Sequence, residues 1–253
     1  MCNAGGGRNL SSAQAFTLAE VLVTLGIIGV VSALTLPVLM AAYQKNVTLT
    51  QLKKSYSSLS QAVRLSEADN GFLSDWDVGY GHNLFENYIL PYLNIVDYCI
   101  LGECENKGIH FGLEGNKYVV PAGPNGTDKL PGDKDNTWIV VMSDGSMLYV
   151  YQSLYNNYVI SRIILDLNGN KRPNRTGKDI FSLLLLTDSL VGNQDIADTV
   201  IVKPGIYFEG FGQTRTAITD RSKYYNCNKG GYAFTCGALI QYDGWKINKD
   251  YPW

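Results

Sequence analysis

The sequence predicts an α+β fold, in which one long N-terminal helix spans a membrane and packs by its C-terminal half on a small antiparallel β-sheet domain. The first observation is a run from Val21 to Gln44 that contains no Asp, Glu, Lys or Arg. As a helix this run would be about 36 Å long, and the hydrocarbon core of a bilayer is about 30 Å thick. The second observation is an apolar stripe at helical spacing after this run. The third is a strand–turn–strand pattern near the middle of the chain.

The helix is expected to continue beyond the apolar run. Apolar residues recur there at three- and four-residue steps, which is typical of a helix with one face on a core. A seam between helices of an assembly is the alternative interpretation. Asn70-Gly71 is typical of a helix C-terminus, and irregularity is expected inside the helix at Gly29 and Pro37. The stripe consists of Leu49, Leu52, Tyr56, Leu59 and Val63.

The later part of the chain predicts strands and short helices. Apolar runs at residues 138–142 and 147–151 flank Asp144-Gly145, and Asp-Gly between apolar runs favours a hairpin. A third strand of that sheet is expected at residues 159–165, and residues 180–186 form either a strand or a buried helix. Three shorter elements are also expected, a strand at residues 117–120 and helices at residues 83–93 and 231–242.

Size and composition limit the possible functions. Roughly 200 residues follow the apolar run, which is enough for one globular domain with its own core. The net charge of −2 gives no basic surface for nucleic acid, and two histidines leave little material for His-based catalysis. Nothing resembles a phosphate-binding loop or a nucleophile elbow. We therefore expect no enzymatic activity and no nucleic-acid binding.

Four of the five cysteines form two local pairs in the sequence, Cys99 with Cys104 and Cys227 with Cys236. An even number of cysteines beyond a membrane segment favours disulfides in an oxidising compartment. Four cysteines allow three connectivities, of which we favour the two local pairs. Zinc binding is the alternative, but the spacings lack a C-x-x-C and no His is adjacent. Cys2 is not a lipoprotein anchor, because no apolar run precedes it.

The segment Phe16-Thr17-Leu18-Ala19-Glu20-Val21-Leu22 resembles the start of a mature type IV pilin or type II secretion pseudopilin. Gly29 and Pro37 also stand where members of that family place a Gly and a Pro in the membrane helix. The resemblance implies that a prepilin peptidase cuts between Ala15 and Phe16 and that the new amine of Phe16 is methylated. The family usually has Gly before the cut, where this chain has Ala15. A secretory signal is the alternative, but its apolar core is shorter and precedes the cut.

The resemblance implies three regions and a role for one carboxylate. Residues 1–15 would be the leader, residues 16–44 the transmembrane and filament-core helix, and residues 45–253 an extracytoplasmic, pilin-like globular domain. In a filament, Glu20 of one subunit would pair with the positive amine of a neighbour. Burying either charge alone would cost several kcal/mol, so the pairing would set the subunit register. A carboxylate in the lipid headgroup region is the alternative interpretation of Glu20.

The implied function is that of a structural subunit of a type IV pilus or a type II secretion-like pseudopilus. Its partners would be the prepilin peptidase and methylase, other pilin subunits in a homo- or hetero-filament, the inner-membrane assembly platform, and membrane lipid before assembly. The chain would cross the bacterial inner membrane once, with its C-terminal domain outside, and then enter the filament. The flanking basic residues do not fix this orientation, which comes from the resemblance. A single-pass anchored enzyme or ligand-binding domain is the alternative.

The loop from Asp166 to Asp179 resembles a segment that recurs in pseudopilin-like proteins, some of which carry calcium. Asp166, Asn168 and Asp179 offer the oxygen ligands that calcium prefers. The loop is not an EF-hand, because the twelfth position from Asp166 is Gly177 rather than Glu. The alternative is a polar turn whose Asp and Asn side chains bond to nearby backbone groups, and in that case we expect no cofactor.

Overall fold

The structure is a computed structural model that describes residues 17–76, 84–109, 119–122, 126–129, 137–155, 158–169, 171, 174–187, 203–223, 225–228 and 232–252. The chain divides into two compact units, residues 1–46 and 47–253, and each is considered by itself. The expected leader and its cut between Ala15 and Phe16 lie outside the described residues.

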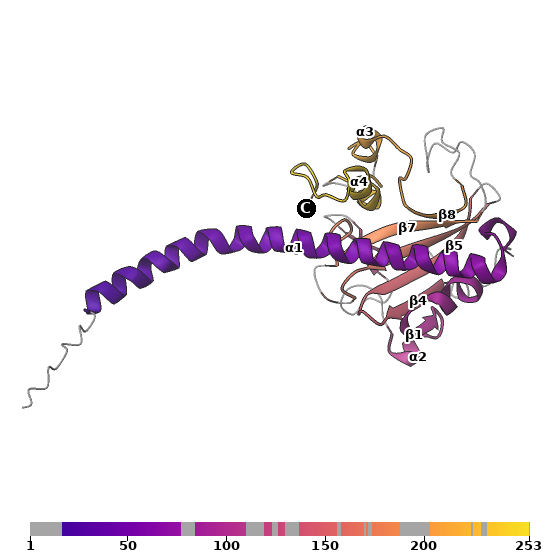
Figure 1. The fold of residues 1–253 in the computed structure, drawn as a ribbon, viewed down its shortest axis with the longest axis horizontal. Helices are drawn as coiled ribbons and strands as arrows, with labels where there is room; N and C mark the ends of the chain where they lie inside the picture. The colour runs from indigo at the N-terminus through magenta and orange to yellow at the C-terminus, as the bar shows by residue number, and fades with distance from the viewer. Residues whose placement is uncertain are drawn as a thin grey trace, which may run out of the picture. The chain divides into compact units, whose positions relative to one another are not determined.

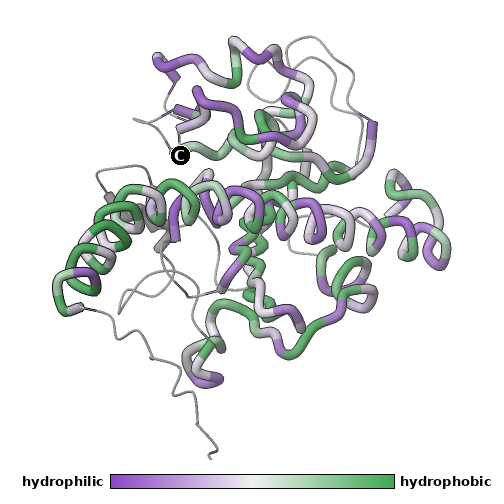
Figure 2. The backbone as a smooth tube through the Cα atoms, turned by 60° about the vertical axis from the view of Figure 1, so that its left-hand side comes forward, coloured by the Kyte–Doolittle hydropathy of each residue, from purple (hydrophilic) through white to green (hydrophobic). Residues whose placement is uncertain are grey.

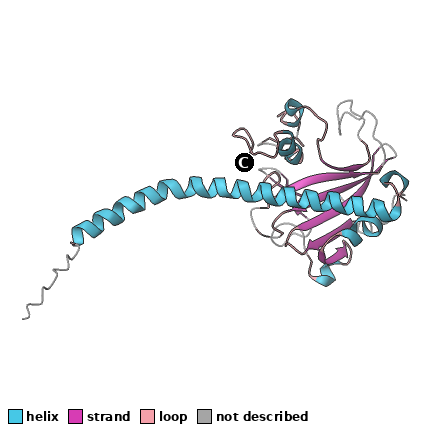
Figure 3. Cartoon of the chain, viewed as in Figure 1, coloured by secondary structure: helices cyan, strands magenta, loops and turns pink. Residues whose placement is uncertain are grey.

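Helix α1 runs without a break from Leu18 to Asn70 (Figures 1 and 3). It contains both Gly29 and Pro37, so the irregularity expected there does not interrupt it. Pro37 has no N–H, and the carbonyl one turn earlier therefore loses its helical donor. The helix ends where Gly71 adopts a φ of 83° and donates its N–H to the Glu67 carbonyl at 3.1 Å. This is the left-handed glycine cap that the Asn70-Gly71 pair predicts.

From Val21 to Tyr43, α1 carries no charged side chain and is apolar on all sides. Its large side chains are exposed around the whole circumference, and Figure 2 shows the hydrophobic colour along it. Among the described helices, α1 is the one that is long and apolar enough to cross a membrane. The exposed set runs along the helix and includes Leu18, Leu22, Leu25, Ile28, Val31, Leu34, Val38, Leu39 and Tyr43.

The second unit is built on a six-stranded antiparallel sheet in the order β1-β4-β5-β6-β7-β8. The predicted hairpin is confirmed, because β4 and β5 pair from Val141 opposite Met147 and are joined by a turn in which Gly145 has a φ of 86°. Residues 180–186 are a strand. The strands are β1 (Ile95–Ile100), β4 (Thr137–Met142), β5 (Met147–Tyr155), β6 (Tyr158–Asp166), β7 (Ile180–Leu186) and β8 (Gly205–Phe208), while β2 (Val119–Ala122) and β3 (Gly126–Lys129) form a separate pair.

The short helices differ in detail from expectation. Residues 83–93 were expected to be one helix, but a π-helix, η2 (Phe85–Ile89), is followed by a 3₁₀ turn, η3 (Leu90–Tyr92). Pro91 has no N–H to continue the helical ladder, which accounts for the change. The remaining helices are η1 (Leu73–Asp75), α2 (Cys104–Lys107), α3 (Arg215–Ile218) and α4 (Cys236–Tyr242).

From Val47 onward, α1 covers one face of the sheet. Leu52, Leu59 and Val63 of the predicted stripe are buried there, against strand residues such as Trp138 and Phe181. The interpretation of the stripe as a helix face on the domain core is therefore confirmed. The opposite face of the sheet is covered by the segment that follows β1, where Leu101, Cys104 and Ile109 cluster with Cys99 of β1.

The C-terminal segment packs on the same face as α1. The ring of Tyr56 in α1 stacks on Phe208 of β8, with ring centroids 5.0 Å apart, and lies 5.8 Å from the ring of Trp245. Gly237 at the start of α4 lies so close to Phe208 that a Cβ there would overlap its ring. This glycine lets α4 approach the sheet closely.

The buried stripe can be tested with two leucines of the same helix. Leu59→Ala should lower the free energy of unfolding by about 2–5 kcal/mol, because Leu59 is 1 % exposed and its removal leaves a cavity. Leu65→Ala is the matched control and should change it by less than about 0.5 kcal/mol, because Leu65 is 46 % exposed. Chemical denaturation measures both, and equal losses would contradict the packing described.

Candidate functional site

The first candidate site is the beginning of α1, where Thr17 and Glu20 form a reciprocal pair. The N–H and the Oγ1 hydroxyl of Thr17 both donate to Oε2 of Glu20, at 2.9 and 2.7 Å. The N–H of Glu20 donates back to Oγ1 of Thr17 at 3.3 Å. This is a capping box, which satisfies backbone donors that no helical carbonyl can reach. The sequence reasoning missed this role of Thr17, although the T-x-x-E pattern before an apolar run is its signature.

The capping box has a consequence for the role expected of Glu20. Both hydrogen bonds from Thr17 go to Oε2, so the carboxylate keeps Oε1 for a further partner. Glu20 thus has a local structural role that does not depend on any neighbouring chain. The two roles can be separated, because the capping box needs a hydrogen-bond acceptor and the expected ion pair needs a charge.

The four cysteines are joined as the two local pairs that the sequence favours, Cys99–Cys104 and Cys227–Cys236. The first closes the segment between β1 and α2. The second joins the stretch after α3 to the first residue of α4. Each closes a short loop, and such a link stabilises the fold by about 2–3 kcal/mol in the chain-entropy model. Structural zinc at these cysteines is therefore not supported.

The second candidate site is the loop between β6 and β7, which brings Asp166, Asn168 and Asp179 together. Asp166 is fully buried at the end of β6, and its Oδ1 accepts the N–H of Asn168 at 3.1 Å. Asp179 is also buried and accepts the N–H groups of Asn174 and Arg175 at 2.8 and 2.6 Å. The side-chain amide of Asn168 donates to Asp179 at 3.1 Å. The predicted polar turn is thus present in the structure.

Two buried side-chain oxygens of the turn accept no hydrogen bond from the described residues. Oδ2 of Asp166 and Oδ1 of Asn168 have no hydrogen-bond partner among the described residues. Burial raises the pKa of Asp166 to about 8, with a further contribution from the charge of Asp179. Burial also raises the pKa of Asp179, although its N–H donors oppose this. A buried acceptor without a donor costs free energy, so a proton or a cation at this place would offset that cost.

The chemistry of the loop fits a calcium ion. Calcium takes six to eight oxygen ligands in flexible geometry, including carboxylate, amide and carbonyl oxygens. The described residues contain no group of three or more His, Cys, Asp or Glu that could hold a metal. Asp166, Asn168 and Asp179 would therefore supply part of the ligand set, and backbone carbonyls and water the rest. The cation would supply positive charge and cross-linking between β6 and β7.

The loop is fastened to the C-terminal segment at Gly177. This residue has a φ of 78°, and a Cβ on it would lie 2.9 Å from the sulfur of Cys236 and 3.4 Å from the hydroxyl of Tyr251. The Tyr251 hydroxyl donates to the Gly177 carbonyl. On the other side, a Cβ on Gly169 would lie 2.8 Å from the Gly145 carbonyl in the β4–β5 turn. Close packing therefore holds both ends of the loop in place.

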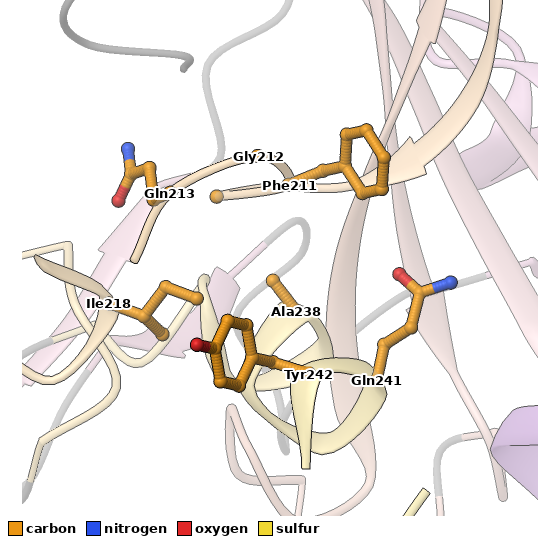
Figure 4. Close-up of a pocket in the computed structure, with 8 residues that line it drawn as sticks. Phe211, Gly212, Gln213, Ile218, Ala238, Gln241 and Tyr242 are labelled. Carbon is orange, nitrogen blue, oxygen red and sulfur yellow. The ribbon is translucent and has the colours of Figure 1, made fainter. Parts of the chain in front are cut away.

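A pocket of about 430 Å³ lies beside α4, and the sequence reasoning missed it (Figure 4). One wall is the loop after β8, with Phe211 and Gln213, and the other is α4, with Ala238, Gln241 and Tyr242. The side chain of Ile218 projects into the space between the walls (Figure 4). None of the lining residues is charged. The sequence shows residues 210–212 only as a glycine-containing loop, because the pocket arises from contacts between distant segments.

The raised pKa of Asp166 gives a pH dependence. Between the ordinary carboxyl pKa of about 4 and the folded-state value of about 8, the folded chain keeps a proton that the unfolded chain has released. With chelator present, the free energy of unfolding should therefore fall as pH rises through this range. Asp166→Asn should make the free energy of unfolding nearly independent of pH over this range. At about pH 8 the variant should be more stable than the wild type. Chemical denaturation across the range measures this, and a wild-type stability that rises toward pH 8 would contradict it.

The comparisons with known proteins identify a family but no function. A family model described as a family of unknown function, DUF6613, matches residues 38–111 and 117–253. No curated protein and no solved structure matches the chain. The match covers most of the chain, including the six-stranded sheet, both disulfides and the Asp166–Asp179 loop. The chain therefore belongs to DUF6613, a family of unknown function.

Proposed function

We propose that this protein is a pilin-like structural subunit, cut before Phe16, methylated there and assembled into a type IV pilus or a type II secretion-like pseudopilus. The observation that carries the proposal is the continuity of α1. One unbroken helix begins beside the prepilin-like segment, is apolar on all sides up to Tyr43, and then becomes the core helix of a folded domain. A simple membrane anchor would not need to share its helix with the domain core.

Two further features support the proposal. The apolar part of α1 can occupy a bilayer before assembly and a filament core afterwards, because both surroundings exclude water. The two disulfides favour an oxidising compartment for the domain. In this proposal the prepilin peptidase and methylase, the inner-membrane assembly platform and other pilin subunits are the partners, and the protein is not an enzyme. Secretion, adhesion, motility and DNA uptake are all compatible with it.

Two variants separate the roles of Glu20 in assembly. Glu20→Gln keeps an acceptor for the Thr17 capping box but removes the charge, whereas Thr17→Val removes the hydroxyl of the capping box and keeps the charge. If the carboxylate pairs with the amine of a neighbour, Glu20→Gln should insert in the membrane but enter filaments about tenfold less. Thr17→Val should enter filaments nearly as well as wild type. Quantitative blotting of sheared filaments and membranes measures both.

The same cells test the processing step. Mass spectrometry of the N-terminal peptide should find methylated Phe16 as the first residue. Normal filament entry of Glu20→Gln would remove the support for charge pairing. An intact leader on most of the protein would instead favour the alternative of a single-pass anchored enzyme or ligand-binding domain.

A second function is favoured by the unpartnered oxygens of Asp166 and Asn168. We propose that the Asp166–Asp179 loop binds calcium and that the ion stiffens the connection between β6 and β7. Both oxygens are buried and lie in a loop that contains a second buried carboxylate, Asp179. A plain polar turn would not need the fully buried carboxylate at position 166.

Calcium should therefore raise the melting temperature of the processed protein in detergent, compared with chelator. A ligand that binds only the folded state adds about 2.7 kcal/mol at a hundredfold excess over its Kd. Asp166→Asn should abolish the effect. Asp220→Asn, in an exposed turn where Asp220 bonds Ser222, is the matched control and should keep it. Equal melting temperatures in calcium and in chelator would show that the loop is only a polar turn and binds no calcium.

A further inference from the structure

Phe72 presents an aromatic ring to solvent at the end of α1. It is 74 % exposed. Its neighbours hold its backbone firmly, because Leu73 and Trp76 are buried, and the Trp76 indole donates to the Gly71 carbonyl at 3.0 Å. The Phe72 carbonyl accepts the N–H of Asp75 at 2.8 Å. The ring is therefore a fixed apolar projection, and burying it against another surface is favourable.

The pocket beside α4 has the chemistry to receive such a ring. Ile218 and Ala238 are buried, and Phe211 and Tyr242 are exposed, so the walls offer apolar and aromatic contact. Gln213 and Gln241 add amide groups that can bond to the backbone of an incoming segment. Its volume of about 430 Å³ is that of a small-ligand pocket, which leaves room for one aromatic side chain.

The projection and the pocket lie at different places along α1. Trp245, three residues beyond α4, contacts α1 at Tyr56, and Phe72 lies sixteen residues further on. At about 1.5 Å per residue the separation along the helix axis is about 24 Å. Figure 1 shows the same arrangement within the domain, with α4 well back along α1 from its C-terminal end. One copy cannot bring the two together, but a second copy shifted along the axis can.

The segment that carries Phe72 and the C-terminal segment that carries the pocket have net charges of opposite sign. Residues 65–76 contain three acidic side chains, Glu67, Asp69 and Asp75, and no basic one. The described residues from 203 to 252 contain six basic and four acidic side chains. Charge complementarity of this kind steers two surfaces together and disfavours the wrong register. The exposed basic residues of this segment are Lys203, Arg221, Lys223, Lys246 and Lys249.

We infer that Phe72 of one subunit inserts into the pocket beside α4 of a second copy of this chain. The contact joins two different surfaces, so each copy offers one projection and one pocket. Such a head-to-tail contact repeats without closing and generates a helical fibre. The inference rests on the proposed filament function and adds a domain-to-domain contact to the packing of the apolar helices.

Disulfide cross-linking in native filaments tests the contact. In a Cys2→Ser background, the full chain carries Phe72→Cys and Tyr242→Cys together. Mild oxidation should convert these filaments into a ladder of covalent multimers on non-reducing gels. Each single variant should stay monomeric, and co-expressed single variants should give dimers only. Val96→Cys with Tyr242→Cys is the matched control without a ladder, because Val96 is 69 % exposed on the edge strand β1.

Loss of the ring tests the same contact without added cysteines. Phe72→Ala should lower filament yield by about tenfold, while Val96→Ala should leave it unchanged. Thermal unfolding of Phe72→Ala should match wild type, which excludes a folding defect. If wild-type filaments form, but the double-cysteine filaments give no ladder and Phe72→Ala enters filaments normally, this inference is overturned and the proposed function stays intact. A wild-type chain that is never cut and never assembles would overturn both.

Discussion

Helix α1 is apolar on all sides up to Tyr43 and apolar along one stripe from Leu49 onward, and the domain depends on that stripe. One face of the sheet is lined by large apolar residues such as Trp138 and Phe181. The strands pair edge to edge, so another element has to cover this face. Leu52 and Leu59 of α1 cover that face. Trp245 of the C-terminal segment packs beside them, against the ring of Tyr56 in α1. A folded domain without this part of α1 would expose the face, so the helix and the sheet form one folding unit.

Features set by neighbouring residues could be predicted from the sequence. The stripe of α1, its glycine cap and the β4–β5 hairpin each depend on periodicity or turn chemistry within a few positions. The pocket beside α4 and the burial of Asp166 depend on segments far apart in the chain, so no local pattern announces them. The η2 π-helix was also unpredictable, because a local pattern does not distinguish it from an α-helix. The Thr17–Glu20 capping box was also predictable, because it follows the local T-x-x-E pattern, but the sequence reasoning missed it.

The loop after β6 shows how burial changes the chemistry of an ordinary turn. In solvent, Asp166 and Asp179 would simply bond nearby backbone groups, as such residues commonly do in turns. Here both carboxylates are buried, and Oδ2 of Asp166 has no hydrogen-bond donor among the described residues. Gly169 and Gly177 fit closely against the β4–β5 turn and Cys236, so a side chain at either position would displace its neighbours. The local charge balance, rather than the turn, is the unusual property of this segment.

The capping box makes the start of α1 independent of whatever precedes it. Its donors and acceptors belong to Thr17 and Glu20 alone. Removing all residues before Phe16 would leave every one of these bonds in place, since the N–H of Thr17 belongs to the peptide bond that follows Phe16. Helix starts that borrow an acceptor from upstream residues would fray after such a cut. A chain built in this way can exchange its N-terminal extension for a free amine without rebuilding the first turn of the helix.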